Sequence, residues 1–417
     1  MKEPGGQVTL GSLCERITVG HVGPMADSYT SSGVPFLRSQ DIGEFRISTS
    51  GIKFIPPEFD QKLKKSRLKA GDVAIVRTGY PGTAAVVPHE LDGANCADLV
   101  VLTPGPELDA WFVASLLNSA WGRGHVSGVL VGVAQQHFNV GAARDLKTVF
   151  PSLHIQQRIG SIIRTYCDLI EVNQRRIAIL EDMARRLFDE WFVRFRYPGH
   201  EAVPIVETEL GMIPEGWAIV RADEMIDFDP RTKVPKEGIK RFVPMGSLDT
   251  VSSVISDWET RSGNSGSKFQ NGDTLFARIT PCLENGKTGL VNFLETGEIA
   301  FGSTEFTVMR GKGVSSSFVY LLARSGAFRA IAIKSMGGAD GRQRVRTEAL
   351  KGYEFACPPT GLLSKFASVT APMLGQVRVF ANQNARLRTA RDLLLPKLIS
   401  GEIDVSAAYE TFAEAAE

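Results

Sequence analysis

Two long segments of the chain carry apolar residues at steps that alternate between three and four, and together they limit the possible folds most strongly. Such spacing lines these side chains along one narrow stripe of a helix, which is buried against another helix as in a coiled coil. The first stripe comprises Ile155, Ile159, Ile162, Tyr166, Leu169, Asn173, Ile177, Leu180, Ala184, Leu187 and Trp191, and the second comprises Phe366, Val369, Met373, Val377, Phe380, Asn384, Leu387, Arg391, Leu394 and Leu398. Any fold for this chain must therefore contain two long helices, each buried along one side.

Polar residues and a proline interrupt these stripes. Asn173 and Asn384 lie on them, where a polar side chain costs stability but can fix the register of the helices; alternatively, each faces a polar group or water. Pro372 lies inside the second segment, and a proline within a helix removes a hydrogen bond and costs roughly 3 kcal/mol or more. We therefore expect the second helix to be kinked or broken near Ala371, after a short helix that starts at about Leu362. Trp191, on the first stripe, is predicted to be a core residue.

Each long helix follows a stretch of about 150 residues, and the two stretches resemble each other. In both, a Gly-Asp turn precedes a short apolar strand that ends in arginine, and a short buried helix follows later. The matching segments are 69–78 with 270–279 and 111–117 with 317–323. Prolines end each stretch, at Pro151 and at Pro358-Pro359, where they are tolerated just before a helix. The chain is therefore a tandem duplication of a globular domain followed by a long helix.

The sequence also predicts the fold class of the two domains. Their β-branched runs are short, are punctuated by Gly, Pro, Asn and Asp, and alternate little with helices, which predicts an α+β fold rich in strands. Prolines and a glycine break any helix between the repeats. The predicted division is a first domain over 1–150, a helix over 151–196, a linker over 197–211, a second domain over 212–357, a helix over 358–404 and a tail over 405–417.

Charge and cysteine content narrow the class of protein. The chain has 47 basic and 46 acidic side chains, so its net charge of +1 indicates no polyanionic partner by itself. However, residues 62–77 and residues 324–346 each hold six basic side chains against one acid, and such runs either neutralise phosphates or form solvated surface. The five cysteines are scattered without CxxC spacing, which argues against a disulfide framework or a zinc site and suits a reducing compartment.

The ends and the least charged stretch of the chain predict its location. The opening residues lack the features of a signal peptide. The longest stretch without Asp, Glu, Lys or Arg, residues 124–143, contains His, Gln and Asn and therefore predicts no membrane span. We expect a cytoplasmic protein.

Catalytic patterns occur only as near misses. Gly286-Lys287-Thr288 resembles the end of a phosphate-binding loop, but Pro281 stands where that loop needs a glycine. The sequence shows no GxGxxG that opens a helix after a strand, no HExxH, no GxSxG, and no target-base motif of an amino-methyltransferase. The six histidines lack metal-ligand spacing. We therefore expect a binding module without a catalytic site or metal of its own.

Four longer segments indicate a family. They are residues 180–192 (LEDMARRLFDEWF), 210–217 (LGMIPEGW), 280–287 (TPCLENGK) and 391–403 (RDLLLPKLISGEI). Together they closely resemble the specificity subunit of type I restriction-modification systems, in the family's order and over essentially the whole chain. One departure concerns the second helix, whose start at residues 358–362 lacks the glutamine-containing entry that the first helix has at residues 151–157.

The resemblance implies a non-catalytic subunit that selects a DNA sequence. Two target-recognition domains would each read one half of a split, asymmetric site, and the two helices would pack as an antiparallel coiled coil that spaces them. The implied partners are double-stranded DNA, two methyltransferase subunits and motor-nuclease subunits, and S-adenosylmethionine, ATP and Mg would belong to those partners. At 1.5 Å per residue, a helix of about 40 residues spans roughly 60 Å, an upper bound on the spacing.

Other interpretations remain open. The chain would also fit a specificity subunit of another multisubunit DNA-modification or phage-exclusion system, for which neighbouring genes would differ. A coiled-coil scaffold whose globular ends bind proteins predicts no DNA binding. A stand-alone DNA-modifying enzyme would methylate or cleave DNA without partners.

Residue chemistry suggests which side chains would read the DNA. Arginine can form two hydrogen bonds with the edge of guanine, and asparagine or glutamine can do so with adenine. Glycine-flanked polar loops at corresponding places in the two repeats, and the residues after the matched strands, provide such groups. The predicted DNA-binding residues are Arg38, Gln40, Arg77, Thr78, Gln135, Gln136 and Asn139 in the first domain and Arg278, Thr280, Lys287, Arg342, Gln343, Arg344 and Arg346 in the second. Arg77 and Arg278 fit equally well as ion-pair partners of Asp72 and Asp273.

Overall fold

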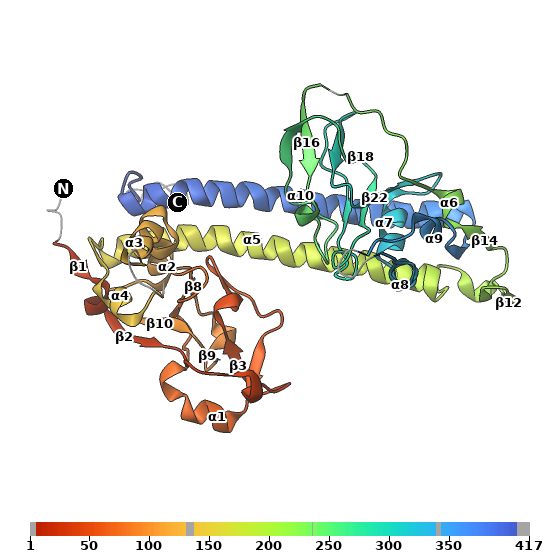
Figure 1. Ribbon diagram of the computed structural model, residues 1–417. Coiled ribbons are helices and arrows are strands. Elements are labelled where there is room, and N and C mark those ends of the chain that lie inside the picture. The colour runs from red at the N-terminus through yellow and green to blue at the C-terminus, as the bar shows by residue number, and fades with distance from the viewer. Residues whose placement is uncertain (1–5, 131–136, 236, 339–342, 407–417) are drawn as a thin grey trace, which may run out of the picture. The chain divides into compact units, whose positions relative to one another are not determined.

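The computed structural model describes residues 6–130, 137–235, 237–338 and 343–406 (Figure 1). They form two compact units. Unit 1 combines the described residues up to Ile170 with those from Arg386 onward, and unit 2 contains residues from Glu171 to Ala385. In both units a mixed α+β domain packs on parts of two long helices. No helix among the described residues is long and apolar enough to cross a membrane.

The domain of unit 1 contains a four-stranded antiparallel sheet in the order β2-β10-β7-β8 and a three-stranded sheet in the order β6-β3-β9. Two short pairs, β1 with β11 and β4 with β5, complete it. The strands are β1 (Val8–Thr9), β2 (Cys14–Val19), β3 (Val34–Leu37), β4 (Ile42–Gly43), β5 (Arg46–Ile47), β6 (Lys53–Ile55), β7 (Val73–Val76), β8 (Ala84–Val86), β9 (Asn95–Cys96), β10 (Leu99–Pro104) and β11 (Lys147–Thr148). Its α-helices are α1 (Pro57–Lys62), α2 (Ala110–Asn118), α3 (Ala120–Leu130) and α4 (Val140–Asp145).

The domain of unit 2 repeats this plan. Its sheets have the orders β15-β22-β19-β20 and β17-β16-β21-β18, beside the pairs β12-β13 and β14-β23. The strands are β12 (Ile205–Thr208), β13 (Gly211–Pro214), β14 (Ala218–Arg221), β15 (Ile226–Phe228), β16 (Ile239–Val243), β17 (Glu259–Ser262), β18 (Ser267–Gln270), β19 (Thr274–Ala277), β20 (Thr288–Leu290), β21 (Ile299–Gly302), β22 (Phe306–Gly311) and β23 (Glu354–Cys357). The helices are α6 (Ala222–Met225), α7 (Ser316–Arg324), α8 (Gly326–Lys334) and α9 (Thr347–Lys351).

The matched segments fold alike, as the sequence predicts. Strands β7 and β19 follow the Gly-Asp turns and are buried at every residue. Helices α2 and α7 occupy the predicted positions and begin with equivalent caps, because the side chains of Asp109 and Ser315 accept hydrogen bonds from the amides of Phe112 and Phe318. The equivalent strand order of the large sheets in the two units confirms the internal duplication.

The two long helices are α5 (Leu153–Phe188), which continues as a π-helical turn (Asp189–Val193), and α10 (Thr360–Ser400). Each contributes residues to both units. In unit 2, Asn173 of α5 contacts Asn384 of α10, and Trp191 of the π-helical turn contacts Phe366 of α10. Residue numbers thus rise along one helix as they fall along the other. The helices are therefore antiparallel there, as expected for the predicted coiled coil (Figure 1). The side-chain amide of Asn173 donates to the carbonyl oxygen of Asn384 over 3.1 Å, so each Asn faces the other's polar group.

Two residues of the predicted stripe are exposed. Leu169 and Val369 are 48% and 41% exposed, whereas the adjacent Ile170 and Thr370 are 7% and 0% exposed. A straight helix has 3.6 residues per turn and drifts away from a strict heptad pattern, which moves the buried position by one residue. Trp191 is 7% exposed and packs in the unit 2 core, which confirms its assignment as a core residue.

Helix α10 is unbroken from Thr360 to Ser400, so the expected break near Ala371 and the separate short helix from Leu362 are wrong. Pro372 lies on the exposed side of the helix. Ser368, whose carbonyl loses its usual amide donor, is exposed too, so water can bond to that carbonyl. Burial of the neighbouring turns against the unit 2 core holds the helix together around the proline.

The two long helices start differently. Gln156, the fourth residue of α5, is 1% exposed, and its amide donates to the carbonyls of Glu107 (3.1 Å) and Pro151 (2.9 Å) while its oxygen accepts from the amide of Asp109 (3.0 Å). At the fourth position of α10, Leu363 is buried in the core instead. Polar bonds thus fix the start of the first helix and apolar packing fixes the start of the second.

Candidate DNA interface

In unit 1 the predicted residues Arg77 and Thr78 meet at the end of strand β7. A terminal nitrogen of Arg77 donates to Asp98 over 3.0 Å, and the Thr78 hydroxyl donates to the other oxygen of Asp98 over 2.8 Å. The backbone carbonyl of Arg77 accepts from the amide of Phe138, which brings His137 to 3.0 Å from the Thr78 hydroxyl. Arg77, Thr78, Asp98 and His137 form what we call the strand-end site of unit 1.

The strand-end site of unit 2 consists of Arg278, Thr280, Glu305 and Arg344. The Arg344 guanidinium donates to both carboxylate oxygens of Glu305, with nitrogen–oxygen distances of 2.9 and 2.6 Å. Arg278 lies 3.5 Å from the same carboxylate. The Thr280 amide donates to the carbonyl of Gln343 over 3.1 Å. The hydrogen bond from Arg344 lowers the pKa of Glu305, and this effect outweighs partial burial, which acts to raise it. The site therefore presents two guanidinium groups around one ionised carboxylate.

The two sites share one backbone frame. The carbonyl of Arg278 accepts from the amide of Val345, as that of Arg77 accepts from Phe138. The next residues, Asn139 and Arg346, are the N-cap positions of α4 and α9. His137 therefore corresponds to Arg344 in position but not in chemistry. The same frame thus offers different hydrogen-bonding groups in the two units.

One predicted alternative is wrong. Asp72 pairs with Arg16 over 2.8 Å and Asp273 pairs with Arg310 over 2.6 Å, so neither binds the arginine at the end of its own strand. Asp72 and Arg77 stand at opposite ends of β7, about 16 Å apart in an extended strand. Arg77 and Arg278 instead bind acids that directly precede the neighbouring strands β10 and β22.

The other predicted DNA-binding residues form bonds within the protein or lie outside the strand-end sites. The Arg38 guanidinium bonds to Asp41 at 2.8 Å, and the Asn139 side chain caps α4 by accepting from the amide of Ala142. Lys287 is partly buried and donates to the carbonyl of Met245 over 3.1 Å. Gln40 and Arg346 are exposed. Gln135, Gln136 and Arg342 lie outside the described residues.

Sequence reasoning missed Asp98, Glu305 and His137. A signal for the two acids exists, because each directly precedes an apolar strand of the central sheet in its repeat. His137 belongs to the glycine-flanked polar loop predicted from the sequence, but only the folded chain brings it to Thr78. Among the described residues, no group of three or more His, Cys, Asp and Glu side chains is arranged to hold a metal ion.

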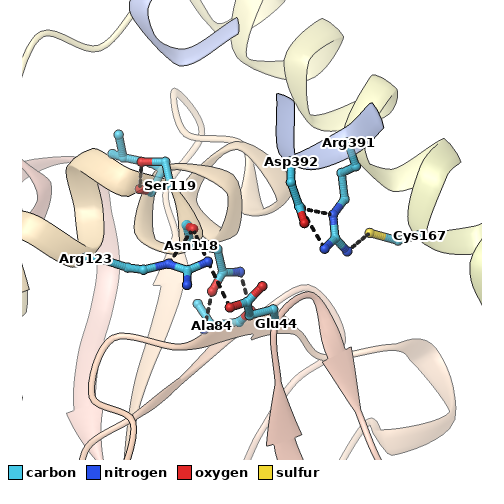
Figure 2. A network of polar contacts seen from close by, with 9 residues as sticks. Glu44, Ala84, Asn118, Ser119, Arg123, Cys167, Arg391 and Asp392 are labelled. Atoms are coloured by element: carbon cyan, nitrogen blue, oxygen red, sulfur yellow. Dashed lines mark hydrogen bonds and ion pairs between the residues drawn. The ribbon is translucent and has the colours of Figure 1, made fainter. Parts of the chain in front are cut away.

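Two groups of polar contacts lie in unit 1, one within the domain and one on the long helices (Figure 2). At the tip of the β4-β5 hairpin, Glu44 pairs with Arg123 over 2.8 Å, and Arg123 also bonds to the carbonyl of Asn118. Arg391 of α10 lies 5.0 Å from the centre of the adjacent Phe45 ring and is 3.9 Å from the sulfur of Cys167 on α5. The β4-β5 hairpin of the unit 1 domain thus contacts both α3 and α10.

The equivalent hairpin of unit 2, where Leu248 pairs with Ile255, is held by a buried acid from α5 and a partly buried arginine from α10. Glu181 of α5 is 1% exposed and accepts from the amide and the hydroxyl of Ser253, both at 2.6 Å, and from the Tyr320 hydroxyl at 3.2 Å. Arg378 of α10 donates to the carbonyl of Ile255 over 3.1 Å, and burial lowers its pKa to about 10. The domain therefore sits on its helices in a defined orientation.

Known proteins with similar sequences share one description. The chain is 24% identical to the type I restriction enzyme MjaIX specificity subunit of Methanocaldococcus jannaschii over 279 residues, which are 63% of this chain and 62% of the relative. It is 24% identical to the EcoEI specificity subunit of Escherichia coli over 205 residues, 48% of this chain and 34% of that subunit. The chain thus covers less than two thirds of the length of these relatives. No family model matches it.

A solved structure shows the same fold. The S subunit of a type I restriction-modification system from M. genitalium aligns with 95% of this chain and 97% of its own, with a TM-score of 0.55 and 12% sequence identity. Its match extends over both units, including the duplicated domains and the long helices. In sequence the chain is similar to specificity subunits of type I restriction enzymes, and in fold it is similar to one such S subunit.

Proposed function

We propose that this chain is the DNA-recognition subunit of a type I restriction-modification complex and that each domain reads one half of a split, asymmetric site. The observation that carries the proposal is the pair of strand-end sites, which share a backbone frame and differ in their side chains. Base edges are distinguished by the donors and acceptors that reach them. One frame with an Arg-Thr-His-Asp set and another with two arginines and a threonine around a glutamate would therefore select different bases.

The reactions themselves would belong to partner subunits. Two methyltransferase subunits holding S-adenosylmethionine would dock on the paired helices, and motor-nuclease subunits using ATP and Mg would join for cleavage. Helices α5 and α10, with 36 and 41 residues, would act as the spacer between the two reading domains. This chain would contribute no catalytic group.

The test is to co-express the chain with the methyltransferase subunit of its system and map methylated adenines across the host genome. A single motif, split into two parts by a fixed gap, is the expected result. Scattered methylation, or none from a complex that assembles, would contradict the proposal. Methylation or cleavage by the purified chain alone would identify an enzyme instead.

Two variants assign the half-sites. Arg344→Ala should relax base preference in one half of the motif, and Thr78→Ala should do so in the other, each by about 1–3 kcal/mol of discrimination. The matched control is Arg221→Ala, because Arg221 is exposed and pairs with Asp223 outside the strand-end site. Sequencing of the methylated sites measures both effects, and a variant that changed both halves equally would refute the assignment.

A further inference from the structure

The sheet β17-β16-β21-β18 of unit 2 has two chemically different faces. Side chains alternate between the faces along a strand, and directly paired residues share a face. On one face Val243, Phe269 and Ala300 are buried in an apolar core. On the other, Phe242 of β16 lies opposite Phe301 of β21, with ring centres 5.2 Å apart.

This second face is basic. It carries Lys240, Arg261 and Lys268 against one acid, Glu259, so its side chains sum to 3 − 1 = +2. Lys240 and Arg261 stand directly opposite each other on antiparallel strands. Arg261 pairs with Glu259 over 2.6 Å, and the Lys240 ammonium donates to the backbone carbonyls of Glu237 and Gly238. This excess of positive charge on one sheet face, in a chain whose net charge is only +1, favours an anionic ligand. We call Lys240, Arg261 and Lys268 with the two phenylalanines the basic sheet face.

A hollow of about 490 Å³ opens over the basic sheet face. Phe242 and Phe301 line it together with Arg261, and Asn264 and Thr304 add polar groups to its wall. The Arg261 guanidinium lies 3.7 Å above the centre of the Phe242 ring, and its side chain is 48% exposed. The aromatic ring holds the guanidinium in place while leaving part of it accessible.

The hollow adjoins the strand-end site of unit 2. Ser303 and Thr304 line it, and the next residue is Glu305, whose amide donates to the Ser303 hydroxyl over 3.2 Å. On another side, Met245 lines the hollow and accepts the hydrogen bond from Lys287. A duplex read at Arg344 would therefore have its backbone within reach of the basic sheet face.

Unit 1 uses the equivalent sheet face differently. Phe36 of β3 corresponds to Phe242 of β16. Each is the next-to-last residue of its strand, and each pairs with a neighbouring parallel strand. Phe36 is 0% exposed because Met25, Tyr29 and Phe59 pack over it. Phe242 is only partly buried and has a guanidinium above it. The open, basic form is thus a property of unit 2.

We propose that the basic sheet face binds DNA phosphates that flank the bases read at the strand-end site of unit 2. The inference rests on the proposed function and adds a contact surface to it. Phosphate contacts fix the position of a protein on the duplex without carrying sequence information. The basic sheet face would therefore set affinity and salt dependence, whereas Arg344 would set base preference.

The test measures binding of the full-length chain, in complex with its methyltransferase subunit, to two duplexes over a series of salt concentrations. One duplex carries the mapped motif and the other has the same length and a random sequence. Lys240→Gln, Arg261→Gln and Lys268→Gln should each reduce the slope of log affinity against log salt by about 0.9 on both duplexes, and the triple variant by three times as much. Arg221→Gln, which also removes one exposed charge, should leave the slope unchanged.

The outcomes separate the two proposals. If the wild-type complex shows no preference for the mapped motif, the proposed function fails. If the preference is present but the three single variants and the triple variant keep the wild-type slope, the basic sheet face does not bind phosphates. Weakening confined to the motif-bearing duplex would make these residues base readers and would also overturn the inference. Glu259→Gln provides a variant of opposite sign, which should tighten binding to both duplexes.

Discussion

At the scale of single residues, the strand-end site of unit 2 depends on one shared carboxylate. Glu305 is 18% exposed and binds Arg344 at two oxygens while Arg278 lies nearby. This arrangement presents both guanidinium groups in fixed directions, which suits bonding to base edges in the major groove. Loss of Glu305 would therefore disorder the donors rather than remove them.

The charge of Glu305 also predicts a dependence of stability on pH. Because Arg344 holds the pKa of Glu305 below its usual value, the ionised carboxylate stabilises the folded state fully above the unfolded pKa, and this contribution is lost as the pH falls through the folded pKa. Glu305→Gln should thus be less stable than the wild type at pH 7, and the difference should shrink below pH 4.5. Urea unfolding at both pH values measures it. A difference that stayed constant with pH would show that the ion pairs do not contribute.

Glu181 provides a second prediction at this scale. Its carboxylate accepts from Ser253 and Tyr320, and burial together with the nearby Glu181 charge raises the pKa of Tyr320, so the phenol stays protonated as a donor. Glu181→Ala leaves buried donors unpaired and should lower the free energy of unfolding by about 3 kcal/mol. Asp182→Ala, which removes a neighbouring carboxylate in a surface ion pair, should cost less than about 1 kcal/mol. Similar losses for both variants in urea denaturation would refute the anchoring role of Glu181.

At the scale of elements, sequence patterns predicted what depends on local chemistry. The Gly-Asp turns, the apolar strands β7 and β19 and the long helices follow from residue spacing alone. The partners of Arg77 and Arg278 do not, because Asp98 and Glu305 come from neighbouring strands that only folding brings alongside. The buried stripe was predicted to within one residue, since heptad spacing and the true helical period diverge slowly.

At Pro372, tertiary packing overrides the expectation that a proline breaks a helix. The proline still lacks an amide, but the exposed position of the affected turn and the buried turns on either side keep α10 continuous. Pro372→Ala should therefore raise the free energy of unfolding by up to about 3 kcal/mol. Gly375→Ala, on the same exposed side, should raise it by about 1 kcal/mol and serves as the reference for propensity alone. A neutral or destabilising Pro372→Ala, measured by urea denaturation, would show that the proline is structurally required.

At the scale of the whole molecule, duplication has kept the frame and changed its chemistry. The sheets, the capped helices and the helix-bound hairpins recur in both units. The side chains of the strand-end sites, the starts of the long helices and the sheet face that is basic in unit 2 differ. In the strand-end sites, Arg77 and Asp98 cancel in charge, while Arg278 and Arg344 exceed Glu305 by one positive charge. The sequence predicted two non-identical recognition domains. Which side chains cover the sheet face and what charge each strand-end site carries depend on contacts between distant segments.

The loop from Thr280 to Lys287 has a practical consequence, because it places a thiol beside the unit 2 site. That thiol belongs to Cys282. All five cysteines are free, and burial raises the pKa of four of the thiols, those of Cys14, Cys96, Cys167 and Cys357. A maleimide fluorophore at pH 7.5 should therefore label Cys282 first. Peptide mapping would verify the labelled position, and bound duplex should slow the reaction relative to the free protein. Equal labelling rates with and without DNA would place the duplex away from this loop. The natural sequence thus carries its own attachment point for an optical reporter of half-site occupancy.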